Sequence, residues 1–119
     1  MRKIIDKTNN FKCRDPFILK HSGSFYHCFT EDTKTVSVSC AESIDELENA
    51  ISKVVFAPPE NMEYSKELWA PELHIIDGKC YIYVACDDGH NYNHRMFVLT
   101  NNSNDPLKSE YQMLGQITD

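Results

Sequence analysis

The sequence predicts an all-β fold that contains two copies of a four-stranded antiparallel unit, a partial β-propeller. The first observation is a repeat, because residues 15–23 match residues 70–78 without a gap. Three residues recur at this offset of 55 positions: Pro16 as Pro71, Gly23 as Gly78, and Tyr26 as Tyr81. The second observation is an alternating apolar run after each glycine, which is typical of a half-buried strand. A repeated four-stranded unit of this length is the pattern of propeller blades.

Each copy of the unit is predicted to open with a hairpin. The residues His21-Ser22-Gly23-Ser24 and Asp77-Gly78 have the composition of tight turns. The remaining strands follow in order: third strands over 35–39 and 94–100, and fourth strands over 53–57 and 111–117. Residues 43–50 have helical propensity and predict a short helical turn. We divide the chain into an N-terminal extension (1–12), a first blade (13–60) and a second blade (61–119).

A β-sandwich is the competing architecture, but the gapless match over the first hairpin favours a propeller. Propellers close a ring from about four to eight blades, so two blades do not close one. We therefore expect that the chain is a fragment, that further chain is missing, or that several copies assemble into a homo-oligomer.

Composition excludes some functions. The net charge of −6 argues against nucleic-acid binding, which needs a basic surface. The apolar stretches are strand-sized, and no signal peptide is visible, so we expect no membrane span and a cytoplasmic location. The five cysteines include no CxxC pair, and Cys80 and Cys86 share one strand face, which indicates buried thiols. We expect no metal and no cofactor.

Blade geometry gathers the polar residues at one rim of the propeller. The start of the innermost strand lies at the same end as the loop between strands two and three, which is residues 87–94 in the second blade. The candidate residues on this rim are Asp15, Trp69, Glu72, Asp88, His90, Asn93 and His94. The alternatives are that Trp69 is a hydrophobic anchor between blades and that Asp87 and Asp88 only end the second strand. Carboxylates, amides, imidazoles and aromatic rings suit a sugar, because rings stack on its face and polar groups bind its hydroxyls.

The residues on the innermost strands, Asp15, Glu72 and His74, lead to different expectations. Asp15 matches Ala70 in the repeat, so the turn does not require a carboxylate there, and a functional role is favoured. Glu72 is expected to point either into the channel or into blade packing. His74 lies between Leu73 and Ile75, which predicts a satisfied core histidine.

These motifs resemble glycoside hydrolase family 43, a group of five-bladed propellers that remove arabinose or xylose from plant polysaccharides. The resemblance is carried by Arg14-Asp15-Pro16-Phe17-Ile18, by Leu68-Trp69-Ala70-Pro71-Glu72-Leu73-His74, by Asp77-Gly78-Lys79-Cys80-Tyr81-Ile82-Tyr83 and by Asn93-His94-Arg95-Met96. The last run is most similar to the branch that contains exo-acting α-L-arabinofuranosidases.

The resemblance implies a role for Asp15 as the general base of an inverting hydrolase. It also implies a general acid and a third carboxylate on later blades, which this sequence does not reach. An inverting site needs both carboxyl groups, so we expect the chain alone to be inactive. The implied partner is an arabino- or xylo-oligosaccharide. The alternative is a non-catalytic carbohydrate-binding or self-assembling propeller module.

Overall fold

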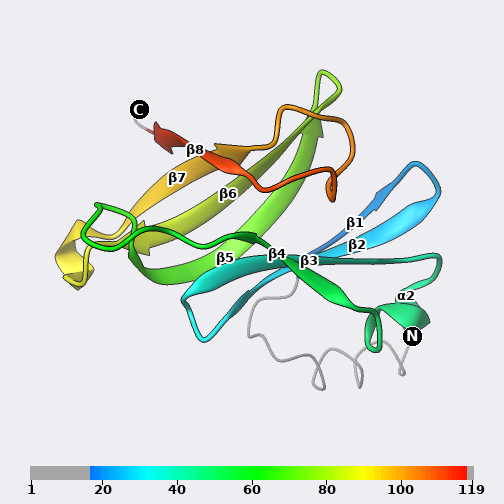
Figure 1. The fold of residues 1–119 in the computed structure, drawn as a ribbon, viewed down its shortest axis with the longest axis horizontal. Coiled ribbons are helices and arrows are strands. Elements are labelled where there is room, and N and C mark those ends of the chain that lie inside the picture. The colour runs from blue at the N-terminus through cyan, green and yellow to red at the C-terminus, as the bar shows by residue number, and fades with distance from the viewer. Residues whose placement is uncertain (1–16, 118–119) are drawn as a thin grey trace.

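The computed structural model describes residues 17–117 and contains two four-stranded antiparallel sheets (Figure 1). Each sheet is a meander, in the order β1-β2-β3-β4 and β5-β6-β7-β8. The strands of the first sheet are β1 (Phe17–His21), β2 (Ser24–Glu31), β3 (Thr35–Ala41) and β4 (Ser52–Phe56). Those of the second are β5 (Lys66–Ile76), β6 (Lys79–Asp87), β7 (Arg95–Thr100) and β8 (Gln112–Gln116). The predicted all-β fold with two four-stranded blades is confirmed.

The two opening hairpins have the same pairing register. Phe17 pairs with Cys28 in the first, and Glu72 pairs with Tyr83 in the second, which are the positions related by the sequence repeat. Both turns use two central residues with positive φ, Ser22-Gly23 and Asp77-Gly78. Positive φ at both positions matches the right-handed twist of the flanking strands. The repeat therefore encodes one hairpin geometry twice.

The second innermost strand is longer and less regular than predicted. The sequence places its start at Ala70, whereas β5 begins at Lys66. Its register against β6 shifts on both sides of Trp69, and Glu67 and Ala70 have φ values of 51° and 49°. Bulges of this kind re-aim side chains next to functional sites.

The predicted helical turn is present as α2 (Ile44–Leu47). The Ser43 hydroxyl accepts a hydrogen bond from the Glu46 backbone N–H and donates one to its carboxylate. The serine thereby caps a helix too short to be stable alone. Leu47 is 2% exposed, so the helix is fixed by burying this one side chain against the first sheet.

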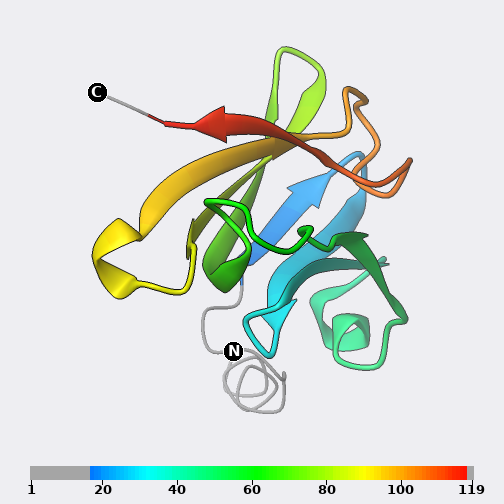
Figure 2. The ribbon, with the colours of Figure 1, turned by 60° about the vertical axis from the view of Figure 1, so that its left-hand side comes forward.

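The two sheets lie side by side (Figure 2), and one hydrophobic core joins them. Its fully buried members come from both blades: Cys28, Val36, Val38 and Val55 from the first, and Leu68, Leu73, Cys80, Ile82, Val84, Cys86 and Leu99 from the second. The four described cysteines are thiols. Burial, followed by the neighbouring Asp87, raises the pKa of Cys86 to about 12, so its thiol stays protonated and packs as a small apolar group.

Backbone hydrogen bonds join the blades at several points along the interface. The Leu68 N–H donates to the Thr33 carbonyl at 2.9 Å, and the Tyr111 N–H donates to the Val55 carbonyl at 2.8 Å. The His21 side chain contacts the Asn104 carbonyl at 2.9 Å near the opposite end. These contacts fix the blades relative to each other.

The prediction of a core position for His74 is wrong. Its side chain is 41% exposed and its Nε2 lies 3.2 Å from the Glu72 carboxylate, which is itself 55% exposed. The reason is strand alternation, because Leu73 occupies the face of β5 that packs on the first blade. Glu72 and His74 consequently occupy the opposite face, and the buried orientation considered for Glu72 is not adopted.

That opposite face of the second sheet carries partly exposed apolar side chains. Ile76 is 44% exposed, Met96 42% and Leu114 58%. Among residues 17–117, no helix is long and apolar enough to cross a membrane.

Candidate functional site

The start of β5 and the loop after β6 meet at one rim, as the repeat predicts. Lys66 pairs with Asp87, and the hydrogen bond from Leu68 to Thr33 brings the β2–β3 turn of the first blade to the same edge. Asp15, the predicted general base, lies outside the described residues. Phe17, two positions later, has its ring centroid 5.4 Å from that of His74, so the start of β1 lies beside β5.

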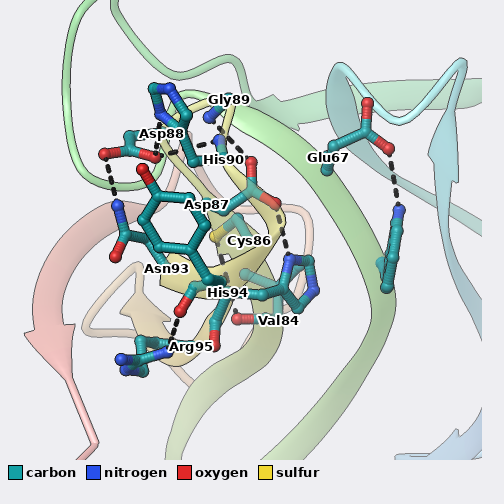
Figure 3. A network of polar contacts seen from close by, with 12 residues as sticks. Glu67, Val84, Cys86, Asp87, Asp88, Gly89, His90, Asn93, His94 and Arg95 are labelled. Atoms are coloured by element: carbon teal, nitrogen blue, oxygen red, sulfur yellow. Dashed lines mark hydrogen bonds and ion pairs between the residues drawn. The ribbon is translucent and has the colours of Figure 1, made fainter.

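A buried carboxylate organises the loop of the second blade (Figure 3). The Asp87 side chain is 2% exposed and accepts hydrogen bonds from the Gly89 N–H at 2.8 Å and the His94 ring at Nδ1, 3.0 Å away. The imidazole Nδ1 donates, so the carboxylate fixes the orientation of the His94 ring. The other ring nitrogen, Nε2, is buried and has no hydrogen-bond partner among the described residues.

Trp69 forms the aromatic wall of the site. Its ring lies 4.2 Å from the His94 ring, centroid to centroid, and its Nε1 donates to the Glu67 carboxylate at 3.2 Å. The residue remains 42% exposed. A tryptophan fixed on both sides and open on its remaining surface suits stacking against a sugar ring.

A second hydrogen-bonded group fixes the tip of the loop. The Asp88 carboxylate accepts from the His90 N–H at 3.1 Å, contacts the His90 ring at 3.3 Å, and accepts from the Asn93 amide at 3.0 Å. Desolvation acts to raise the pKa of Asp88, but these hydrogen bonds outweigh it and hold the pKa below its usual value. Asp88 is therefore ionised at neutral pH.

The two groups are linked through the short 3-10 helix η1 (Asn91–Asn93). One guanidinium nitrogen of Arg95, Nη1, donates to the carbonyl oxygens of Tyr92 and His94 at 3.0 and 2.9 Å. These bonds satisfy carbonyl groups at the C-terminal end of the helix. The loop is thus held by hydrogen bonds at its start, tip and end.

The structure brings together most of the predicted site residues. Trp69 contacts His94, and Asp88 contacts His90 and Asn93. Glu72 does not join either group and instead faces His74. Within residues 17–117, no group of three or more His, Cys, Asp or Glu side chains is arranged to hold a metal ion.

Sequence reasoning missed three contributors to the rim. Asp87 was placed in the rim loop but not chosen as a site residue, and Glu67 and Arg95 were not selected. The signal for Asp87 was its place directly after an apolar strand and seven residues before His94. The role of Glu67 depends on a bulge in β5, which no sequence pattern indicated.

Comparison with known proteins identifies relatives over nearly the whole chain. The model of the glycosyl hydrolases family 43 matches residues 8–119. An α-L-arabinofuranosidase 43 of Humicola insolens is 34% identical over 106 residues, which cover 87% of this chain and 22% of that protein. An extracellular exo-α-(1→5)-L-arabinofuranosidase of Streptomyces chartreusis is 29% identical and is covered to 32%. The chain therefore spans a fifth to a third of the length of these relatives.

Solved structures agree with these matches. An α-L-arabinofuranosidase from Lactobacillus brevis superposes with a TM-score of 0.81 at 31% identity, over 90% of this chain and 37% of that one. The Bacillus subtilis arabinanase Arb43A superposes with a TM-score of 0.64 at 17% identity, which shows a shared fold. The two sheets are therefore two blades of a partial five-bladed propeller. The chain belongs to glycosyl hydrolases family 43.

Proposed function

We propose that this chain forms the first two blades of an inverting glycoside hydrolase that acts on arabinose- or xylose-containing oligosaccharides. The rim carries the proposal, because Trp69 is held half-exposed between Glu67 and a His94 ring that the buried Asp87 orients. Relatives named as arabinofuranosidases support the sugar class. The substrate and activity belong to the complete propeller.

In this proposal Asp15 is the general base. It removes a proton from a water molecule that attacks the anomeric carbon, while a general acid on the opposite side protonates the leaving oxygen. The contact between Phe17 and His74 supports this role, because it brings the start of β1 beside the Trp69 strand. Inversion requires the two carboxyl groups to lie about 6.5–9.5 Å apart, which leaves room for the water.

The sugar ring is proposed to stack on the open surface of Trp69. The buried Nε2 of His94 is a polar atom without a described partner, so a hydroxyl group or a water can bind there once the rest of the propeller is in place. Glu72 lies farther along β5, 3.2 Å from the His74 ring, and is proposed to contact the sugar from there.

A chimaera tests the proposed base. Residues 1–119 are joined to the remaining blades of the Lactobacillus brevis arabinofuranosidase, and turnover of p-nitrophenyl α-L-arabinofuranoside is measured. Asp15→Asn is expected to reduce kcat by about 10²–10⁴-fold and to leave substrate binding intact. Asp45→Asn, on the exposed surface of α2, is the matched control and should not change kcat. Full turnover by the Asp15→Asn chimaera would contradict the assignment.

A non-catalytic or self-assembling module is the second candidate. The observation in its favour is the apolar surface of Ile76, Met96 and Leu114 on the second sheet. Exposed apolar patches of this kind mark interfaces. Sedimentation of the purified chain distinguishes the candidates, because a closed ring of several copies would support assembly and a monomer would not.

A further inference from the structure

A hollow beside the loop at this rim is lined by residues other than Trp69 and His94. It has a volume of about 300 Å³ and is lined by Glu63, Asp88, Asn93, Arg95, Phe97 and Gln116. This volume is at the lower end of the range for small-molecule sites, about 300–1,000 Å³. The hollow therefore suits a ligand the size of one monosaccharide unit.

Its polar walls are fixed before any ligand arrives. The Asn93 amide donates to Asp88 at 3.0 Å, and Asp88 is further held by His90, as Figure 3 shows. The Nη1 atom of Arg95 is anchored to two loop carbonyls, which sets the plane of the guanidinium. Groups that are already ordered lose little entropy on binding, so this arrangement favours affinity.

An aromatic ring forms its apolar part. Phe97 is 3% exposed, and its ring makes an edge contact with Tyr64, at 5.7 Å between centroids. Tyr64 and Glu63 belong to the segment that connects the blades, so the walls are the connection, the loop, β7 and β8. Phe97 also belongs to the core shared with the first blade, so the hollow borders the contact between the two blades.

We propose that this hollow is a second carbohydrate subsite, which binds one neutral pentose unit of the polysaccharide that the Trp69 rim binds. The lining offers carboxylate oxygens as acceptors and guanidinium and amide groups as donors, the mixture that pentose hydroxyls need. Two carboxylates outnumber one guanidinium, which disfavours an anionic sugar. The pentose class rests on the proposed function, whereas the geometry of the hollow does not.

Titration of the ¹⁵N-labelled chain tests the subsite. Linear α-1,5-arabino-oligosaccharide and β-1,4-xylo-oligosaccharide are added separately, and the amide resonances of Asn93, Arg95 and Gln116 are followed. A shift with either pentose probe is expected, and the stronger one identifies the sugar. Tri-galacturonate is the anionic control and should bind more weakly.

Matched variants locate the binding. Gln116→Ala and Glu63→Gln are expected to weaken the Kd roughly tenfold, as for the loss of one hydrogen bond to a ligand. Gln112→Ala, on the same strand, and Glu60→Gln, in the same connection, should leave Kd unchanged.

Three results overturn the subsite. They are no shift at the hollow with either pentose, tighter binding of galacturonate, and unchanged affinity in both hollow variants. The first of these results includes shifts restricted to Trp69 and His94, which would leave the proposed function standing. Failure of the proposed function is read separately, from the turnover of the Asp15→Asn chimaera.

Discussion

The two opening hairpins share one backbone register but use it differently. His27 and Ile82 occupy equivalent positions, and both are buried, at 3% and 0% exposure. Ile82 packs in the core between the blades, whereas His27 stacks on Phe29 with ring centroids 4.5 Å apart. The two hairpins thus share one backbone register, whereas the side chains at equivalent positions differ in type and in packing.

The rims of the blades differ more than their hairpins do. Asp32 and Asp87 are equivalent in the repeat, but Asp32 lies in a tight exposed turn and Asp87 is buried under an eight-residue loop (87–94). Asp87 therefore acquires partners, His94 and Gly89, that the first blade does not supply. The longer loop of the second blade therefore supplies hydrogen-bond partners that the short turn of the first blade lacks.

The largest expected effect comes from the shared scaffold. Ile82→Ala removes a fully buried side chain between the blades, and we expect the free energy of unfolding to fall by about 2–5 kcal/mol. Urea unfolding followed by tryptophan fluorescence measures it. Ile51→Ala, at a side chain that is 93% exposed, is the control and should change stability by no more than about 0.5 kcal/mol. Equal losses in both variants would break the assignment of Ile82 to the interface.

His27, which occupies the position of Ile82 in the first blade, predicts a pH dependence of the free energy of unfolding. Burial lowers the pKa of His27 to about 4 from its ordinary value of 6.5. Between these pH values the unfolded chain binds a proton that the folded chain does not, so stability falls as the pH falls from 6.5 to 4. The loss approaches about 3 kcal/mol, at about 1.4 kcal/mol per pH unit.

Urea unfolding at pH 7, 5.5 and 4.5 measures this loss. His27→Leu should flatten the curve over this range, because it removes the titrating group. His90→Leu, at an exposed loop position, should keep the slope. A slope unchanged by His27→Leu would show that another group causes it.

Asp32 and Asp87, the equivalent aspartates of the two rims, test the difference between the two loops. Asp87→Asn weakens the charged hydrogen bonds to His94 and Gly89, and we expect a loss of about 2 kcal/mol together with weaker sugar binding. Asp32→Asn keeps a residue that tolerates positive φ and should cost less than about 0.5 kcal/mol. Thermal unfolding of both variants gives the difference, and similar Tm shifts would contradict the distinction.

The smallest expected effects on stability come from the glycines of the two hairpin turns, and they should be equal in the two blades. Gly23 and Gly78 have φ values of 82° and 76°, and a Cβ at either position would meet no atom within 4 Å. The cost of Gly→Ala is then backbone strain alone, about 1–2 kcal/mol at each turn. Tm values of Gly23→Ala and Gly78→Ala should agree, and a large difference would show that the turns are not equivalent.

Much of the fold was predictable because it depends on local patterns. The paired turns at Gly23 and Gly78, the alternation along β6 and the capping serine of α2 each act within a few residues. The rim was predictable from strand direction alone. His74 was placed wrongly because apolar neighbours in sequence lie on the other face of a strand.

A doubled blade, its register and the rim on which its polar residues gather follow from the amino-acid sequence alone, because turn chemistry and strand periodicity are local. How those polar residues divide into two groups depends on the tertiary structure. The bulges in β5 bring Glu67 to Trp69, and burial of Asp87 fixes His94 beside it. Asp88 and Asn93 line a separate hollow together with Gln116. The contact between Trp69 and His94 and the hollow shared with Gln116 join segments distant along the chain, and they depend on packing between elements that no local pattern encodes.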